Sequence, residues 1–208
     1  MSTSPLCLDS YVIPNVEGDC FLDVGCGYGK WGFLLKKYRG VDSGRTCHIA
    51  GIDIFAPHVE SLRRQGIYDE LVVGDATRLP YADQSFDSVL ACDVLEHLEK
   101  EQGMCMMQEL KRVARICVIV STPNFECLRL GAQTQDGFNE YEAHKSVWTY
   151  PGFCSLGFTT VIGVGGLQIP SWRLSMLLSS LGRIWPSRSR LLIGFWYADG
   201  KKRILCPE

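Results

Sequence analysis

The sequence predicts a single α/β domain with a seven-stranded, mostly parallel sheet that carries helices on both faces. Two observations favour this class. Over the first two-thirds of the chain, short apolar runs alternate with segments of helical periodicity, which is typical of βαβ units. The first of these runs is followed by three glycines at alternate positions, a composition that suits a sharp strand-to-helix turn. Together they indicate a Rossmann-like, doubly wound architecture.

Length and composition agree with one ordinary globular domain. The chain has 208 residues, of which 46% are hydrophobic and 21% are charged. This balance excludes a disordered, collagen-like or coiled-coil protein. The formal net charge of −2 also argues against a polycation that binds nucleic acid through the whole chain.

The parallel part of the sheet is expected within residues 20–123. Each predicted helix follows a strand, and the helix at 57–66 has Pro57 in its first turn and Gly66 at its end, as helices commonly do. Gly103 is expected to interrupt the long helical stretch after the fourth strand. The strands are predicted at 20–25, 48–55, 69–74, 85–92 and 116–123, and the helices at 28–38, 57–66 and 93–114.

The composition of the chain becomes more polar after Pro123. Residues 124–146 are polar and predict a loop. A short helix, a strand, a second helix and a last strand are expected after it. The last strand is predicted to be antiparallel and to close one edge of the sheet. These four elements are predicted at 148–158, 159–166, 172–185 and 190–202.

The helix predicted at 172–185 is amphipathic and carries Trp172 and Trp185 near its ends. Seven Lys and Arg residues oppose two acidic residues from Ser171 onward. This pattern suits contact with an anionic molecule or a membrane surface, and it equally suits a helix that covers a sheet. Both interpretations stay open.

The ten cysteines do not form a metal-binding pattern. No two of them stand in a C-x-x-C pair, so the sequence predicts no metal site. The first twenty residues lack a basic-then-apolar leader, and no uninterrupted apolar stretch is long enough to span a bilayer. We therefore expect reduced thiols and a cytoplasmic protein without a transmembrane segment. The sequence sets no oligomeric state.

The strongest motif is the run DVGCGYG at 23–29, between the first strand and the first helix. Glycines there let the backbone turn sharply and approach a ligand closely. A dinucleotide fingerprint would place its third glycine at position 30, where this chain has Lys30. The spacing therefore disfavours an NAD-dependent enzyme, which remains an alternative.

Two acidic residues stand where the following strands end. Asp53 closes the second strand, where a carboxylate can accept hydrogen bonds from a ribose diol. Asp75 follows the third strand and can accept from an adenine amino group. Ligands of open α/β sheets bind at this edge, so both residues are candidates for one site.

These motifs resemble those of the class I S-adenosylmethionine-dependent methyltransferases. The likeness rests on DVGCGYG at 23–29, GDATRLPYADQSFDSV at 74–89 and DVLEHL at 93–98. It covers residues 20–125 well and the remainder only in the order of elements. It implies S-adenosyl-L-methionine as cofactor and a cofactor-binding core at 20–123. We expect the acceptor side at 124–208 and an N-terminal lid over the cofactor at 1–19.

The resemblance also implies roles for particular residues. The run at 23–29 would hold the methionine part of the cofactor. The acid at the end of the second strand would bind the ribose, and the acid after the third strand would bind the adenine amine. A fourth acid, after the fourth strand, would lie near the methionine amino group. The implied cofactor residues are Asp23, Gly25, Cys26, Gly27, Gly29, Asp53, Ile54, Asp75, Ala76 and Asp93.

The acceptor is expected to be a small molecule methylated on oxygen, nitrogen or carbon, with an anionic or lipid-like acceptor left open. His97 and His144 are the candidates for a general base, and His58 is expected to be solvated. Phe125, Tyr141 and Trp148 are candidates for an aromatic wall on the acceptor side, and packing in the core explains each of them at least as well.

Two further alternatives concern the class of function. Nucleic acid is not expected as acceptor, because CDVL stands where enzymes that methylate base amino groups often carry an Asn/Asp-Pro-Pro-Tyr-like tetrad. A non-catalytic relative that only binds a cofactor or a partner protein is the remaining alternative.

Overall fold

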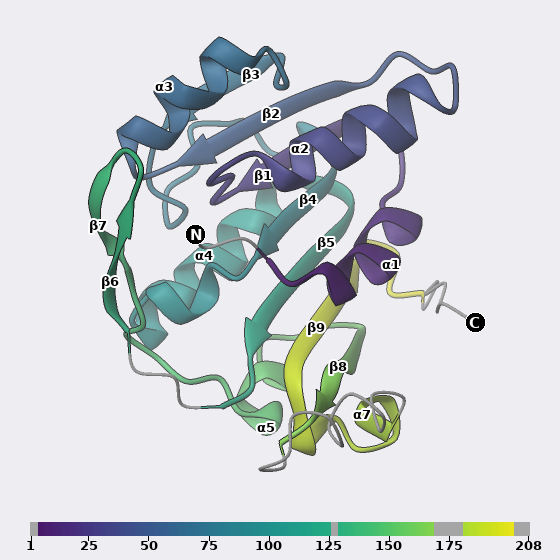
Figure 1. Cartoon of the computed structure of the whole chain (residues 1–208). Helices are drawn as coiled ribbons and strands as arrows, with labels where there is room; N and C mark the ends of the chain where they lie inside the picture. The colour runs from purple at the N-terminus through teal and green to yellow at the C-terminus, as the bar shows by residue number, and fades with distance from the viewer. Residues whose placement is uncertain (1–3, 126–128, 169–180, 202–208) are drawn as a thin grey trace.

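A seven-stranded sheet forms the centre of the computed structural model, which describes residues 4–125, 129–168 and 181–201 (Figure 1). Its strand order is β3-β2-β1-β4-β5-β9-β8, and β6 and β7 form a separate two-stranded sheet. The strands are β1 Cys20–Val24, β2 His48–Asp53, β3 Glu70–Val73, β4 Phe86–Cys92, β5 Ala114–Pro123, β6 Leu130–Thr134, β7 Gly137–Ala143, β8 Thr160–Leu167 and β9 Ser189–Tyr197.

The predicted α/β class is confirmed. Strands β1 to β5 run parallel, and β9 pairs antiparallel with both β5 and β8. The last strand is antiparallel as expected, but the prediction that it closes the edge is wrong. It lies inside the sheet, and β8 is the edge strand. Most residues of β9 are buried on both faces, which suits a strand with neighbours on each side.

Helices cover both faces of the sheet (Figure 1). Trp31, Leu35 and Leu62 belong to the core on one face, and Met106, Leu110 and Phe153 to the core on the other. The helices are α1 Asp9–Val12, α2 Lys30–Leu35, α3 Ala56–Gln65, α4 Lys100–Val113, α5 Tyr150–Cys154 and α7 Leu181–Ile184. Short 3₁₀ segments lie at η1 Leu6–Leu8, η2 Ile13–Asn15, η4 Leu95–His97 and η5 Pro186–Arg188, and a π segment, η3, at Lys36–Val41.

The expected break at Gly103 is wrong, because Gly103 lies within α4. The helical stretch is interrupted earlier, between η4 and α4, where Glu99 caps the helix in a capping box with Gln102. Gly103 is buried beneath the indole of Trp148, and a Cβ there would come within 2.7 Å of Trp148 Cζ2. The glycine thus serves close packing instead of a break.

Residues 124–146 were expected to be a loop, and most of them form the β6–β7 hairpin. Thr134 pairs with Gly137, so Gln135 and Asp136 make a two-residue turn. In Figure 1 this hairpin stands beside the edge at which the parallel strands end. The short helix is confirmed as α5. Residues 172–180 of the next predicted helix, with Trp172, lie outside the described residues.

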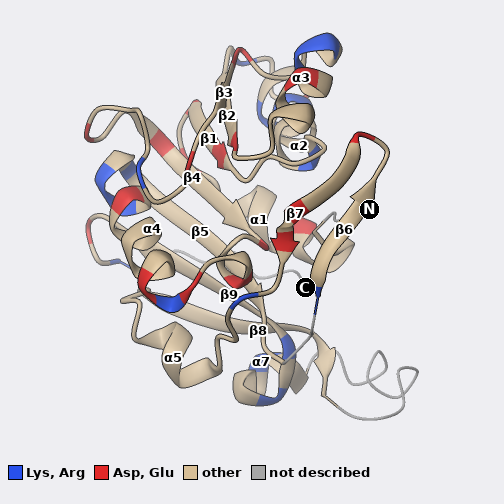
Figure 2. Ribbon diagram, turned by 90° about the vertical axis from the view of Figure 1, so that its left-hand side faces the viewer, with Lys and Arg blue, Asp and Glu red and all other residues tan. Residues whose placement is uncertain are grey.

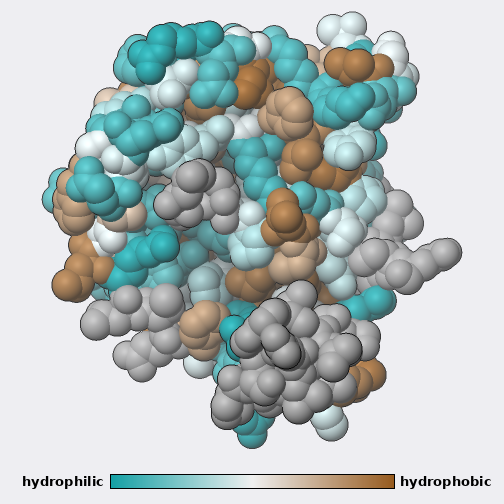
Figure 3. All heavy atoms as spheres, viewed as in Figure 1, coloured by the Kyte–Doolittle hydropathy of each residue, from teal (hydrophilic) through white to brown (hydrophobic). Residues whose placement is uncertain are grey.

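The N-terminal segment packs on the sheet, since Leu8 and Val12 are fully buried in the core. Charged residues lie mainly on helices and connections, and the sheet is mostly uncharged (Figure 2). On the face shown in Figure 3, hydrophobic residues occur in small groups among hydrophilic ones. Within the described ranges, no helix has the length and apolarity needed to cross a membrane.

Candidate active site

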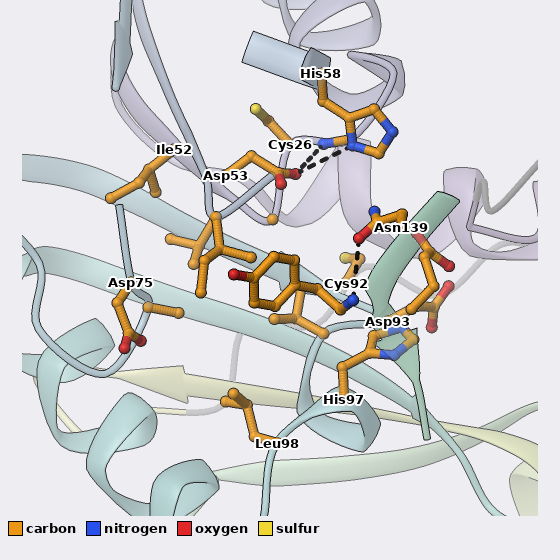
Figure 4. Close-up of a pocket in the computed structure, with 18 of the residues that line it drawn as sticks. Cys26, Ile52, Asp53, His58, Asp75, Cys92, Asp93, His97, Leu98 and Asn139 are labelled. Atoms are coloured by element: carbon orange, nitrogen blue, oxygen red, sulfur yellow. Dashed lines mark hydrogen bonds and ion pairs between the residues drawn. The ribbon is translucent and has the colours of Figure 1, made fainter. Parts of the chain in front are cut away.

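A cavity of ≈ 250 Å³ opens at the carboxyl ends of β1, β2 and β4. Its walls come from the glycine loop before α2, from the segments that follow β2, β3 and β4, and from the β6–β7 hairpin. Figure 4 shows Asp75 at one end, Asp93 and His97 at the other, and Asp53 above the space between them. The cavity therefore joins the residues predicted for the cofactor to the segment predicted to bind the acceptor.

The glycine loop has the backbone shape that its sequence predicts. Gly25, Gly27 and Gly29 have φ values of 71°, 49° and 83°, which favour glycine. A Cβ on Gly25 would come within 2.4 Å of Val94 Cγ2, so a larger residue would not fit there. Gly25 and Gly27 line the cavity, whereas Gly29 lies outside it and caps α2.

Backbone hydrogen bonds join this loop to the end of β2. Both Gly25 N and Cys26 N donate to Ile52 O, at 2.8 and 3.1 Å. Cys26 also lines the cavity, and burial raises the pKa of its thiol, which stays protonated. The loop and β2 therefore form one rigid wall.

Asp53 is fixed at the end of β2 and lines the cavity. Gly27 N donates to its Oδ2 and Phe55 N to its Oδ1, each at 2.8 Å. Two backbone donors hold the carboxylate in one orientation and leave further lone pairs for a ligand hydroxyl. Ile54 lies beside it in the cavity wall and is 40% exposed.

Asp75 and Ala76 line the end of the cavity that follows β3. Asp75 Oδ1 accepts hydrogen bonds from the backbone N and the Oγ1 of Thr77, both at 2.8 Å. This local turn sets the direction of an otherwise exposed side chain. The structure thus brings both predicted adenine contacts to the same cavity as Asp53.

Asp93 lies at the opposite end and has a left-handed backbone, with φ 57°. Its Oδ1 accepts from Ser121 Oγ at 2.8 Å, and its N donates to Ser121 O at 3.0 Å. Burial raises the pKa of Asp93 above its usual range. Left-handed backbone in a non-glycine residue is typical of strained functional positions.

Asp23 does not line the cavity, which corrects its predicted role as a direct ligand of the methionine part. The side chain is fully buried under the glycine loop, and Tyr68 Oη donates to its Oδ2 at 2.6 Å. Tyr68 Oη in turn accepts from Gly32 N at 3.2 Å. Burial raises the pKa of Asp23 to about 7. Asp23 supports the first turn of α2 from beneath.

The β6–β7 hairpin and the residues that follow it form one wall of the cavity, within the segment predicted to bind the acceptor. Asn139, Tyr141, Glu142 and Lys145 line the cavity, and Asn139 Oδ1 accepts from Tyr141 N at 3.0 Å. Tyr141 is the one member of the candidate aromatic wall that does so.

Phe125 and Trp148 do not line the cavity, so the candidate three-residue wall is wrong. Phe125 is 39% exposed away from it. Trp148 is buried in the core, where its Nε1 donates to Ser146 Oγ at 2.9 Å. Its apolar area stabilises the sheet–helix packing instead of a ligand.

Of the two predicted base candidates, His97 lines the cavity and His144 does not. Their rings meet edge to face, with centroids 4.9 Å apart. Burial lowers the pKa of His97, which favours the neutral imidazole. Neighbouring Glu96 is buried, and its pKa is raised by burial and by Asp93.

His58 was expected to be solvated, and that prediction is wrong. It is 2% exposed and lines the cavity, and its Nδ1 lies 3.8 Å from Asp53 Oδ2. The hairpin residue Asn139 was also missed. The Asp136–Gly137 pair, a common hairpin signal, could have indicated the turn that positions it.

The chain is similar to known methyltransferases. A family model described as Methyltransferase domain matches residues 22–116. A probable tRNA methyltransferase 9B from Bos taurus is 35% identical over 101 residues, which cover 49% of this chain and 19% of that protein. A demethylmenaquinone methyltransferase from Halalkalibacterium halodurans is 33% identical over 161 residues, which cover 65% of this chain and 63% of that protein.

A solved structure of a SAM-dependent methyltransferase from Methanosarcina mazei has the same fold. It superimposes with a TM-score of 0.59 at 17% identity, covering 89% of this chain and 96% of that one. The match to the bovine relative spans about a fifth of that relative's length. The matched Methyltransferase domain, the strand order and the cavity at the strand ends all agree with the predicted resemblance to the class I S-adenosylmethionine-dependent methyltransferases.

Proposed function

We propose that this chain transfers a methyl group from S-adenosylmethionine to an oxygen, nitrogen or carbon atom of a small-molecule acceptor. The observation that carries the proposal is the single cavity that runs from Asp75 to the hairpin residue Tyr141. One part of it is lined by the residues predicted for the cofactor, and the other by polar groups of the hairpin. Donor and acceptor can therefore lie in contact.

In this proposal, the acids at the strand ends hold the donor. Asp53, fixed by two backbone donors, accepts hydrogen bonds from the ribose hydroxyls. The backbone at Gly25 and Gly27 lies close to the methionine part, and Asp93 lies near its ammonium group. Asp75, with Ile54 and Ala76 beside it, faces the adenine.

The cofactor supplies a methyl group that is already electrophilic on its sulfonium. An acceptor lone pair forms the new bond to that carbon while the carbon–sulfur pair returns to sulfur. The protein's part is to align the acceptor and exclude water, and positioning of this kind is worth ~7–11 kcal/mol. Neutral His97 can take the proton that a hydroxyl or amine acceptor loses.

The residues that line the hairpin side of the cavity bear on the chemistry of the acceptor. The polar side chains of Asn139, Glu142 and Lys145 suit one that carries hydrogen-bonding or charged groups. A tRNA is the second candidate acceptor, because the bovine relative is described as a probable tRNA methyltransferase. That match covers about half of this chain, so the acceptor of that protein remains a hypothesis here.

Calorimetric titration tests the donor site. We expect S-adenosylmethionine to bind with micromolar affinity, NAD not to bind, and Asp53→Ala to abolish binding. Asp42→Ala is the matched control, because Asp42 is an exposed acid that pairs with Lys37 outside the cavity. If the folded protein does not bind S-adenosylmethionine, or if Asp53→Ala binds it equally well, the proposal is wrong.

A methyl-transfer screen then tests the acceptor. It compares phenols, amines, anionic lipids and unmodified tRNA, with labelled cofactor as the donor. Turnover of a phenol or amine supports the proposed class. Turnover of tRNA alone would replace it with the second candidate, and turnover of anionic lipid alone would indicate a membrane-associated acceptor. Cofactor binding without turnover of any class would favour a non-catalytic binding protein.

A further inference from the structure

Three side chains of metal-binding type meet at the acceptor end of the cavity. Glu96 and His97 belong to η4, and His144 directly follows β7. A carboxylate oxygen of Glu96 and a nitrogen of each histidine all lie within 4.8 Å of one another. Segments far apart in the sequence thus place two imidazoles and one carboxylate around one point.

Backbone hydrogen bonds hold the end of the hairpin on η4. Lys145 N and Ser146 N both donate to Glu96 O, at 2.8 and 3.1 Å. His144 N donates to Arg129 O at 2.9 Å. These backbone hydrogen bonds fix the chain at and after His144, and they thereby keep its ring beside that of His97.

Hydrogen bonds orient the His97 and Glu96 side chains in the way that is usual for metal ligands. His97 Nδ1 lies 3.2 Å from Ala143 O, a contact in which a protonated Nδ1 donates and Nε2 keeps its lone pair. Glu96 Oε2 accepts from Thr122 Oγ1 at 3.0 Å. Imidazole ligands usually donate their other nitrogen to a carbonyl or carboxylate, and carboxylate ligands are themselves hydrogen-bonded.

The charge of the site also favours a cation. The Glu96 carboxylate is 4% exposed, and no Lys or Arg of the described ranges forms an ion pair with it. A buried carboxylate without a positive partner is costly. A divalent ion would supply that charge. His97 lines the cavity, so the ion would border the space that the acceptor occupies.

We propose that Glu96, His97 and His144 bind one divalent first-row transition-metal ion of the Zn²⁺ type. Two imidazoles and one carboxylate suit such ions, whereas Mg²⁺ and Ca²⁺ favour oxygen ligands. Three protein ligands leave a coordination position for an oxygen or nitrogen of the acceptor. With the ion bound, Nε2 of His97 is no longer free to take a proton, so the ion would replace His97 as the group that activates the acceptor. The ion site stands on its own, but its use on an acceptor rests on the proposed methyl transfer.

Metal titration of the chelator-treated full chain tests the site. Calorimetry is expected to show one Zn²⁺ per chain and no comparable binding of Mg²⁺. Glu96→Gln and His144→Ala should each weaken Zn²⁺ binding at least 10-fold. His48→Ala, which removes an exposed histidine at the start of β2, should leave it unchanged.

Cobalt spectra separate this site from binding by the ten cysteines. Co²⁺ held by nitrogen and oxygen should show visible bands without the near-ultraviolet sulfur-to-cobalt transition of a thiolate. If a thiolate band carries all the binding, or if Zn²⁺ binds His144→Ala as tightly as the parent, the proposal is wrong. His144 is only partly buried, so we expect His144→Ala to fold. This variant therefore tests the metal site even if Glu96→Gln does not fold.

Cofactor titration keeps the two proposals separable. His144→Ala and the chelator-treated protein should still bind S-adenosylmethionine, because neither change touches Asp53. Conversely, Asp53→Ala should still bind Zn²⁺. A parent chain that binds S-adenosylmethionine but no Zn²⁺ would therefore refute the metal site and leave the methyl-transfer proposal standing.

Discussion

The imidazole of His58 lies inside the protein with its Nδ1 3.8 Å from Oδ2 of Asp53. The ring is held by Tyr28 and Phe55, whose centroids lie 4.6 and 4.9 Å away. Neither ring nitrogen has a hydrogen-bond partner in the described part of the chain. A buried polar group without a partner is unusual, and here it lies in the cavity wall beside the carboxylate proposed to bind ribose.

We therefore expect His58→Phe to weaken S-adenosylmethionine binding about 5-fold. Phenylalanine keeps the ring contacts with Tyr28 and Phe55 but removes the nitrogens, and one hydrogen bond contributes about 1 kcal/mol. Calorimetry measures the affinity and thermal unfolding the stability, which should change little. His48→Phe serves as the control at an exposed histidine. Unchanged affinity would mean that the His58 ring only packs.

The packing of Trp148 on Gly103 leads to a prediction about stability. Gly103→Ala should lower the free energy of unfolding by about 1–3 kcal/mol, because its Cβ would come within 2.7 Å of the indole. Helix propensity acts in the opposite direction by at most about 1 kcal/mol. Urea unfolding measures the difference. In the control Gly152→Ala, the nearest atom is Thr149 Oγ1 at 3.7 Å, and no loss is expected. Equal effects of the two substitutions would contradict the steric explanation.

The parallel half of the fold could be predicted because local pattern and global topology agree there. The run at 23–29 has glycines where the backbone has positive φ, so the positions of the glycines predict the conformation of the turn. The acids Asp53, Asp75 and Asp93 stand at strand ends, and parallel strands bring their carboxyl ends to one edge. Topology alone was therefore enough to bring these side chains to one cavity.

The hairpin side of the cavity was harder to predict because its geometry depends on contacts between residues far apart in the sequence. Alternating residues of β7 point to different surroundings, so Asn139 is buried and Phe138 is 61% exposed. Trp148 is an aromatic residue of the kind that often lines a ligand site, but its indole packs against Gly103 of α4. The position of β9 depends on whether β8 or β9 pairs with β5, which no local motif indicates.

The buried carboxylate of Asp23 predicts a pH dependence of stability. Burial raises its pKa from 3.8 to about 7, against the opposing effect of the Tyr68 hydrogen bond. Between these values the folded state holds a proton that the unfolded chain has lost, so the free energy of unfolding falls as the pH rises. The contribution is complete below about pH 4 and is lost by about pH 7.

Asp23→Asn removes this titration and keeps an oxygen to accept from Tyr68 Oη. From pH 5 to pH 8, urea unfolding should show the wild type losing up to about 3 kcal/mol relative to the variant. Asp42→Asn, at an exposed acid, should run parallel to the wild type over the same range. A difference between wild type and Asp23→Asn that stays constant with pH would show that Asp23 remains charged in the folded protein.

Two aromatic residues of the segment after β5 allow the proposed donor and acceptor binding to be tested separately. Tyr141 lines the cavity on the hairpin, whereas Phe125 lies outside it, and both are similarly exposed at 38% and 39%. Tyr141→Ala should raise the KM of whichever acceptor is turned over by about 5- to 30-fold, since a buried aromatic contact is worth about 1–2 kcal/mol. The affinity for S-adenosylmethionine should not change, because Asp53 and the glycine loop are untouched. Phe125→Ala should alter neither quantity. A rise in KM for Phe125→Ala and not for Tyr141→Ala would place the acceptor on a different surface, away from the hairpin wall.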